Sequence, residues 1–203
     1  TIRFAEGIAA SDVKVTRSQS HLYFSIKGTN DRLSLRSWFD SDEYKIERIE
    51  FSDGTTWSVQ DLIVATLTGT EGADLFLIGT EGNDFISGLG GIDSLQGGAG
   101  DDTLDGGAGN DTLQGGEGNN TLIGGAGNDL ISSGYYGNNT FDGGEGDDTL
   151  QGGSGNDVYI FRRGDGSDTI SDATPDNMDT IRFAEGIAPS DVILTRDNAG
   201  LHL

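Results

Sequence analysis

Residues 97–132 read GGAGDDTLD, GGAGNDTLQ, GGEGNNTLI and GGAGNDLIS, which are four copies of one nine-residue pattern. Each copy has glycine at its first, second and fourth positions, Asp or Asn at the sixth and an apolar residue at the eighth. The pattern extends in both directions, so that residues 79–160 form nine consecutive repeats, eight of nine residues and one, SGYYGNNTFD, of ten. An earlier copy at 69–77 is separated from them by Ile78.

This period predicts a stack of coils, because each repeat divides into a six-residue turn and a three-residue strand. Side chains alternate along a strand, so each strand points its one apolar residue inward. A single such residue buries little, and only several stacked coils form a continuous core. The predicted inward residues are Ile86, Leu95, Leu104, Leu113, Leu122, Ile131, Phe141, Leu150 and Tyr159.

The turns have the composition of a site for a hard cation. Glycines at the first, second and fourth positions allow positive-φ backbone and leave carbonyl oxygens on the inner side of the turn. The sixth position adds a carboxylate oxygen, and six to eight oxygens at about 2.3–2.6 Å suit Ca²⁺ better than Mg²⁺. We therefore expect several Ca²⁺ ions. The glycine carbonyls predicted as ligands are those of Gly98, Gly100, Gly107, Gly109, Gly116, Gly118, Gly125, Gly127, Gly144, Gly146, Gly153 and Gly155.

Charge supports a cation as the partner and argues against polyanions. The chain has 34 acidic and 12 basic residues, a formal charge of −22, and no Lys or Arg between 62 and 161. Nucleic acid and anionic membrane surfaces are excluded as partners, because both require clustered basic side chains. No apolar run is long enough to span a bilayer, so we expect no membrane insertion. A solvated linker is the alternative interpretation of the glycine-rich block, but a linker does not need this register. Without Ca²⁺ we expect the block to be unfolded.

The flanking segments carry a repeat on a larger scale. Residues 1–17, TIRFAEGIAASDVKVTR, return as TIRFAEGIAPSDVILTR at 180–196, identical at 14 of 17 positions with an offset of 179. We therefore expect the chain to be a window of a longer array. Residues 18–66 alternate apolar and polar positions and are predicted to form short strands. Asp53-Gly54 predicts a hairpin, and a small core is expected from Trp38, Phe39 and Trp57.

The nonapeptides resemble those of the RTX (repeats-in-toxin, haemolysin-type) calcium-binding family, and residues 1–66 resemble the β-rich region that accompanies RTX blocks in large bacterial secreted proteins. The resemblance implies an all-β chain with a parallel β-roll, or β-helix, of nonapeptide repeats and a small β-rich flanking region. We divide the chain into 1–66 (flanking region), 67–172 (calcium-binding roll) and 173–203 (truncated start of the next unit, which would cap the roll).

The resemblance also implies that two repeats make one coil of about 18 residues, with Ca²⁺ between turns of the same edge. One edge would hold Asp84, Asp102, Asn120, Asn139 and Asp157, and the other Asp93, Asp111, Asp129, Asp148 and Asp168. Asp172 and Asp179 are alternatives for the last site. The two Asn fall next to each other on one edge, so we expect weak or vacant sites there and a fully loaded opposite edge.

The function expected from the sequence is structural. We find no HExxH, GxSxG or P-loop motif, so the segment is not predicted to be an enzyme. In the resembled family such blocks accompany type I secretion, and the chain would fold only outside the cell, where Ca²⁺ is abundant. The expected localisation is therefore secreted, extracellular or cell-surface. The alternative function is a polysaccharide- or envelope-binding accessory module, for which Tyr135 and Tyr136 are the candidate contacts in the roll.

Overall fold

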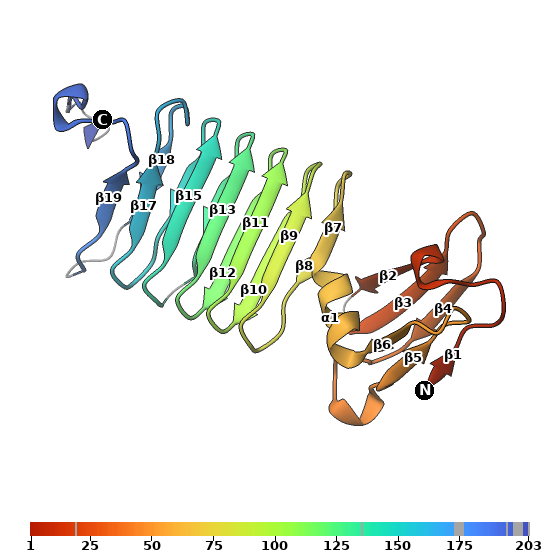
Figure 1. The fold of residues 1–203 in the computed structure, drawn as a ribbon. Helices are drawn as coiled ribbons and strands as arrows, with labels where there is room; N and C mark the ends of the chain where they lie inside the picture. The colour runs from red at the N-terminus through yellow and green to blue at the C-terminus, as the bar shows by residue number, and fades with distance from the viewer. Residues whose placement is uncertain (19, 135, 173–176, 194, 197–200, 203) are drawn as a thin grey trace.

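The computed structural model describes residues 1–18, 20–134, 136–172, 177–193, 195–196 and 201–202. A small N-terminal domain leads into a roll of stacked coils, and the two lie end to end (Figure 1). The sheets of the roll are parallel, with six and seven strands, which confirms the predicted all-β parallel β-roll. None of the helices in this described part of the chain has the length and hydrophobicity needed to cross a bilayer.

The N-terminal domain contains two three-stranded sheets and one α-helix. Its elements are β1 (Ile2–Arg3), η1 (Ala10–Asp12), β2 (Val13–Ser18), β3 (His21–Ile26), β4 (Arg32–Leu35), η2 (Asp42–Tyr44), β5 (Arg48–Glu50), β6 (Thr56–Ser58) and α1 (Val59–Leu67). The hairpin expected at Asp53-Gly54 is confirmed, since β5 and β6 pair antiparallel around it. The small core is also confirmed: Trp38 is fully buried, and Phe39 and Trp57 pack against its cluster.

Helix α1 contradicts the expectation that residues 18–66 form only strands. The Ser58 hydroxyl accepts a hydrogen bond from the Asp61 N–H at 3.2 Å, and the Asp61 carboxylate accepts one from the Ser58 N–H at 2.7 Å. This reciprocal cap satisfies N–H groups at the start of the helix. Leu62 packs into the domain core and Leu67 into the roll core, so α1 joins the two cores.

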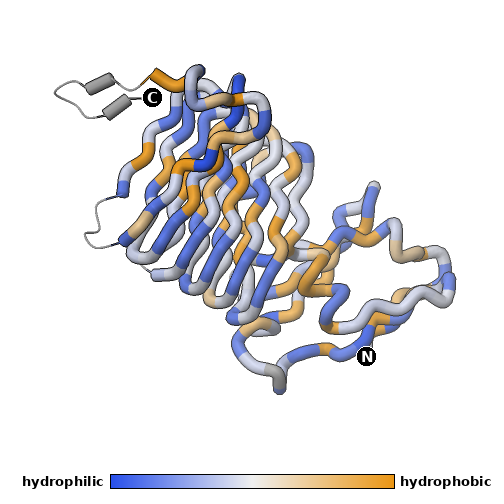
Figure 2. The backbone as a smooth tube through the Cα atoms, turned by 60° about the vertical axis from the view of Figure 1, so that its left-hand side comes forward, coloured by the Kyte–Doolittle hydropathy of each residue, from blue (hydrophilic) through white to orange (hydrophobic). Residues whose placement is uncertain are grey.

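The roll alternates between its two sheets along the chain. One sheet contains β8 (Leu77–Ile78), β10 (Ser94–Ala99), β12 (Thr112–Glu117), β14 (Leu130–Ser132), β16 (Thr149–Gln151) and β18 (Thr169–Ser171). The other contains β7 (Thr68–Thr70), β9 (Phe85–Leu89), β11 (Thr103–Ala108), β13 (Thr121–Ala126), β15 (Thr140–Glu145), β17 (Val158–Phe161) and β19 (Thr180–Phe183). In Figure 2 hydrophobic and hydrophilic positions alternate along the coils.

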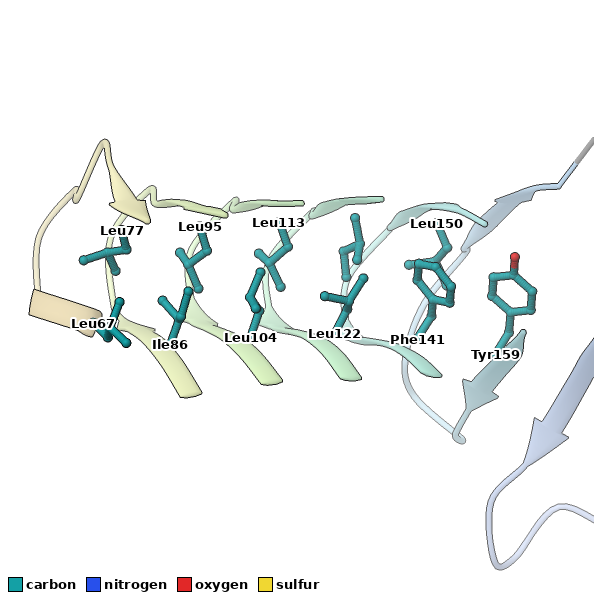
Figure 3. Close-up of a cluster of buried hydrophobic side chains, with 11 residues drawn as sticks. Leu67, Leu77, Ile86, Leu95, Leu104, Leu113, Leu122, Phe141, Leu150 and Tyr159 are labelled. Atoms are coloured by element: carbon teal, nitrogen blue, oxygen red, sulfur yellow. The ribbon is translucent and has the colours of Figure 1, made fainter. Parts of the chain in front are cut away.

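All nine residues predicted to point inward lie in one buried cluster with Leu67 and Leu77. Figure 3 shows these side chains in two facing rows between the sheets. Leu95 pairs with Leu113 one coil later, which confirms the 18-residue coil. The ten-residue repeat lengthens one coil by a residue, so that Leu122 pairs with Phe141. A buried Leu contributes about 1.5–3 kcal/mol, and the core is only two side chains thick, so this stabilisation is modest.

The C-terminal part contains β19, η3 (Pro189–Asp191), β20 (Thr195–Arg196) and β21 (Leu201–His202). Although β19 belongs to the segment 173–203, it pairs in parallel with β17 and continues the sheet of the roll. Arg163 donates hydrogen bonds to the Gly186 carbonyl at 3.2 Å and to the Asp191 carboxylate at 3.0 Å. These contacts hold η3 against the end of the roll.

Candidate calcium sites on the two edges of the roll

The sixth-position residues form two continuous ladders, one along each edge of the roll. In each ladder the backbone N–H of one member donates to Oδ1 of the member one coil later, at 2.7 to 3.1 Å. The first ladder consists of Asp84, Asp102, Asn120, Asn139, Asp157 and Asp179. The second consists of Asp74, Asp93, Asp111, Asp129, Asp148 and Asp168.

The second carboxylate oxygen differs between the two ladders. In the second ladder Oδ2 is buried without a hydrogen-bond partner at Asp93, Asp111, Asp129, Asp148 and Asp168. Among the described residues of the first ladder the same is true of Asp102 alone. A buried anionic oxygen without a partner is costly, and either a bound cation or a proton would remove that cost. Among the described residues, carboxylate oxygens that a cation would stabilise are therefore concentrated on one edge of the roll.

Burial raises the pKa of these same six aspartates, and also that of Asp105, which lies outside the ladders. Burial raises the pKa of Asp129 to about 7, and those of Asp102 and Asp168 to about 6. Burial also raises the pKa values of Asp93, Asp111 and Asp148. In each case the backbone hydrogen bond to the carboxylate lowers the pKa but does not offset burial, and neighbouring aspartates raise it further. Without a cation, the ionised form of these side chains is disfavoured.

At the two Asn positions of the first ladder, the side-chain amide donates hydrogen bonds to oxygen atoms nearby. Oδ1 of Asn120 and Asn139 accepts the ladder hydrogen bond, so the amide nitrogen takes the place of the second carboxylate oxygen. The Asn139 amide donates to the Gly137 carbonyl and to Asp157 Oδ1, both at 3.1 Å. The Asn120 amide donates to the Gly118 carbonyl at 3.5 Å. The carbonyls of Gly118 and Gly137 thus accept hydrogen bonds from these amides.

In the first coil, threonine residues supply the hydrogen-bond donors for the second carboxylate oxygens of Asp74 and Asp84. Thr80 donates to Asp84 Oδ2 from its N–H at 2.6 Å and from its hydroxyl at 2.8 Å. Thr70 makes the same pair of bonds to Asp74 Oδ2, at 2.6 and 2.9 Å. Threonine replaces the second glycine of the pattern in both repeats. Asp84 was predicted as a ligand from its position alone. The repeat pattern did not reveal that Thr80 donates hydrogen bonds to its carboxylate.

The turn glycines serve two different purposes. The predicted positive φ holds at most second and fourth positions, with Gly72, Gly82 and Gly153 as exceptions. At Gly109, for example, φ is 138° and a Cβ would lie 1.5 Å from the Gly91 carbonyl oxygen. At first positions such as Gly97, φ is not positive. There a Cβ would lie 2.4 Å from Asp102 Oδ2 and from the Gly115 carbonyl oxygen. First-position glycine therefore makes room for the ladder.

The ladders end at acidic residues that the sequence placed only in part. Asp168 closes the second ladder, as expected, and Asp179 closes the first. Asp157, Asp172 and Asp179 have carboxylate oxygens within 4.8 Å of one another, and the Tyr159 hydroxyl donates to Asp172 at 2.9 Å. Asp74, which begins the second ladder, was missed although it occupies the sixth position of 69–77.

Basic residues contact the roll at its two ends. Arg17 extends from β2 to the first turn and donates to the carbonyls of Ile78 at 2.6 Å and Gly79 at 3.1 Å. Its guanidinium also lies 3.9 Å from the centre of the Phe39 ring. At the far end Arg162 forms a two-point ion pair with Asp142. The guanidinium group of Arg17 thus connects the N-terminal domain to the first turn of the roll.

Comparison with known proteins agrees with this architecture. Residues 78–113, 105–134 and 133–170 match the RTX calcium-binding nonapeptide repeat, and residues 21–61 match the haemolysin-type calcium binding protein related domain. A curated relative, the iron-regulated protein FrpA of Neisseria meningitidis serogroup C, is 38% identical over 91 residues, which are 43% of this chain and 8% of FrpA. No solved structure matches the chain. The repeat block therefore belongs to the RTX calcium-binding nonapeptide-repeat family, and residues 21–61 belong to its haemolysin-type related domain.

Proposed function

We propose that this segment is a structural module that several Ca²⁺ ions fold, and that the ions bind along the two ladders. The observation that carries the proposal is the set of six buried carboxylate oxygens without a partner. Oxygen ligands and negative charge suit Ca²⁺. The ladder carboxylates, with the carbonyls of neighbouring turn glycines, would hold the ions, and each bound ion would neutralise the charge buried in its turn.

Folding and metal binding are coupled in this proposal. Without Ca²⁺ the ladders bring ionised carboxylates close together in a chain of net charge −22, and the thin core opposes that repulsion weakly. Ca²⁺ binds the folded turns and not the extended chain, so its binding free energy becomes folding free energy. The acidic ladder therefore acts as a calcium switch and requires no catalytic residues.

This coupling suits a chain that is exported unfolded. Cytosolic Ca²⁺ is too scarce to fold the roll, whereas the extracellular concentration is sufficient, so the chain would fold after leaving the cell. We propose that the parent protein uses type I secretion and acts outside the cell or at its surface. The family of the repeat block supports this proposal.

Far-UV circular dichroism during a Ca²⁺ titration, with Mg²⁺ as control, tests the proposal. We expect a cooperative transition to β structure with Ca²⁺ and none with Mg²⁺. Asp129→Asn should remove a buried ligand and move the midpoint to higher Ca²⁺, whereas Asp147→Asn, at an exposed neighbouring position, should leave it in place. A spectrum already rich in β structure in chelator would contradict the proposal.

A second candidate function is binding of a polysaccharide or of the cell envelope. Tyr136 favours it, because its side chain is 71% exposed on the irregular turn of the roll. Tyr135, the other candidate contact, lies outside the described residues. Glycan-array binding in Ca²⁺ that is lost in Tyr136→Ala, with the β-roll spectrum unchanged, would support this function. Equal binding by the variant would remove the argument from Tyr136.

A further inference from the structure

The repeated segment TIRFAEGIA folds twice in this chain and forms an edge strand both times. Its first copy provides β1, the outer strand of the sheet β1-β5-β6, and its second copy provides β19, the last strand of the seven-stranded sheet. Figure 1 shows the two strands at opposite ends of the molecule. The first copy pairs with the strand β5 that follows it, whereas the second pairs with the strand β17 that precedes it.

The two copies use opposite edges of the same strand. In the first, the Phe4 N–H donates to the Glu50 carbonyl of β5 at 2.9 Å. In the second, the N–H groups of Thr180 and Ala184 donate to the carbonyls of Asp157 and Phe161, at 2.8 and 3.0 Å. Phe183 is the counterpart of Phe4, and successive N–H groups of a strand point to opposite edges. The Phe183 N–H therefore points away from β17.

Side chains show the same complementarity. Ile2 and Phe4 pack against the core of the N-terminal domain, and the Phe4 ring stacks on Phe51 with centroids 5.1 Å apart. The counterpart of Ile2 is Ile181, which is 41% exposed. Phe183 contacts Phe161 of the roll at 6.2 Å between ring centroids. The second copy thus presents to solvent apolar surface that the first copy packs against a domain.

The chain beyond β19 starts the same domain again in the same register. Strands β2 and β3 pair Thr16 with Tyr23 and Arg17 with Leu22. Strands β20 and β21 pair Thr195 with His202 and Arg196 with Leu201, which are the same pairs shifted by the offset of 179. The N-terminal hairpin therefore recurs directly after the free edge of β19.

We propose that β19 is a shared strand: one edge holds the roll through β17, and the other binds strand β5 of a second copy of the N-terminal domain. The strand order across the joint would be β17-β19-β5-β6, so one continuous sheet would connect the roll of one unit to the domain of the next. Arg182, the counterpart of Arg3, would meet Glu50 of the second copy, as Arg3 meets Glu50 at 2.5 Å in the first. Successive units would be joined rigidly and in a fixed orientation.

Hydrogen exchange in a two-unit chain tests this proposal. In this two-unit test chain, residues 1–203 are joined directly to a second copy of residues 25–203, because Leu203 is the counterpart of Phe24 at the offset of 179. In saturating Ca²⁺ the Ala184 amide should be protected in both the single chain and the two-unit chain. The Phe183 amide should exchange freely in the single chain and at least about tenfold more slowly in the two-unit chain.

Two other patterns of exchange would overturn the proposal. Unchanged exchange at Phe183 means that the units are joined without a shared strand. Protection gained at Phe183 and lost at Ala184 means that the strand leaves the roll to join the second domain. In the second unit, β19 must take the place of β1 beside β5, so the second domain must fold. If the Trp38 indole of the second copy does not give the signal of a buried side chain, that domain has not folded and the proposal is contradicted.

A cysteine pair gives an independent readout, since the described chain contains no cysteine. Arg182→Cys should form a disulfide with Glu50→Cys of the second copy under mild oxidation, because neighbouring strands lie about 4.8 Å apart. The matched control places the second cysteine at Ser52, two residues along the chain, which is too far for a disulfide. Equal cross-linking of the two pairs would contradict the predicted register.

Discussion

The side-chain amide of Asn139 donates a hydrogen bond to Asp157 Oδ1 at 3.1 Å, whereas the carboxylate of Asp148, on the opposite edge, keeps a buried oxygen without a partner. The two residues occupy the same position of successive repeats. An N–H group in place of one oxygen thus gives the Asn139 side chain a partner within the protein that the Asp148 carboxylate lacks. We propose that the affinity of the roll for Ca²⁺ is likewise set turn by turn.

Asn139→Asp should create a new calcium requirement on the first ladder. The variant replaces a donating amide by a carboxylate oxygen beside Asp157, which should destabilise the folded roll without a bound cation by about 1–3 kcal/mol and so move the midpoint of Ca²⁺-induced folding to higher Ca²⁺. Calorimetric titration should show additional Ca²⁺ bound per chain. Asn138→Asp, at the exposed neighbouring position, is the matched control and should change neither quantity. An unchanged stoichiometry in Asn139→Asp would contradict our interpretation of the first ladder.

Gly97→Ala should destabilise the roll. The added Cβ would lie 2.4 Å from both Asp102 Oδ2 and the Gly115 carbonyl oxygen, so the turn must shift, at a cost of about 1–3 kcal/mol. Gly82→Ala is the control, since the nearest atom to its Cβ is Thr80 Oγ1 at 3.9 Å. Urea denaturation in saturating Ca²⁺ measures both. Equal stability of the two variants would show that first-position glycine does not make room for the ladder.

Acid should promote folding of the chelated chain. Burial raises the pKa of Asp129 from 3.8 to about 7 in the folded roll, so the folded state binds protons more readily than the unfolded chain. The destabilisation from this group is full above about pH 7 and disappears as the pH falls below about 4. Circular dichroism in chelator should therefore show more β structure at about pH 5 than at about pH 8. Saturating Ca²⁺ should reverse this trend, because protons then compete with the metal.

Arg17→Met should weaken the link between the N-terminal domain and the roll. The substitution removes two charged hydrogen bonds to the carbonyls of Ile78 and Gly79 and should cost about 1.5–3 kcal/mol. We expect calorimetry in Ca²⁺ to show the two parts unfolding separately. Lys14→Met, at an exposed position of the same strand, is the control. A single cooperative transition at the wild-type temperature in Arg17→Met would show that α1 alone holds the parts together.

The roll was predictable because its period repeats. One apolar residue every nine positions placed Leu104, Leu122 and their counterparts inward, and this set is confirmed. Helix α1 was missed because its apolar residues form a short run, Leu62 to Ala65, that periodicity alone does not assign to a helix or a strand, although Ser58 and Asp61 are the signal of a helix start. The two edges were predictable from the family resemblance, because each coil takes two repeats.

The chemistry of individual turns was less accessible from the sequence. Whether a carboxylate oxygen lacks a partner depends on contacts between coils, and the repeat pattern treats Asp84 and Asp148 alike. Thr80 donates two hydrogen bonds to the second carboxylate oxygen of Asp84, and this replacement of glycine was visible in the sequence but could not be interpreted without the fold. The expectation of weak sites beside the two Asn remains a proposal, for which the amide hydrogen bonds of Asn139 now supply a physical reason.

Anomalous scattering from crystals grown in Ca²⁺ tests the central claim most directly, because it locates each ion. We predict peaks along the second ladder, beside the second carboxylate oxygens of Asp93, Asp111, Asp129, Asp148 and Asp168, and no peak beside the Asn139 amide. Peaks of equal occupancy on both edges would contradict the account, because the amide hydrogen bonds of the first ladder would then not replace the metal.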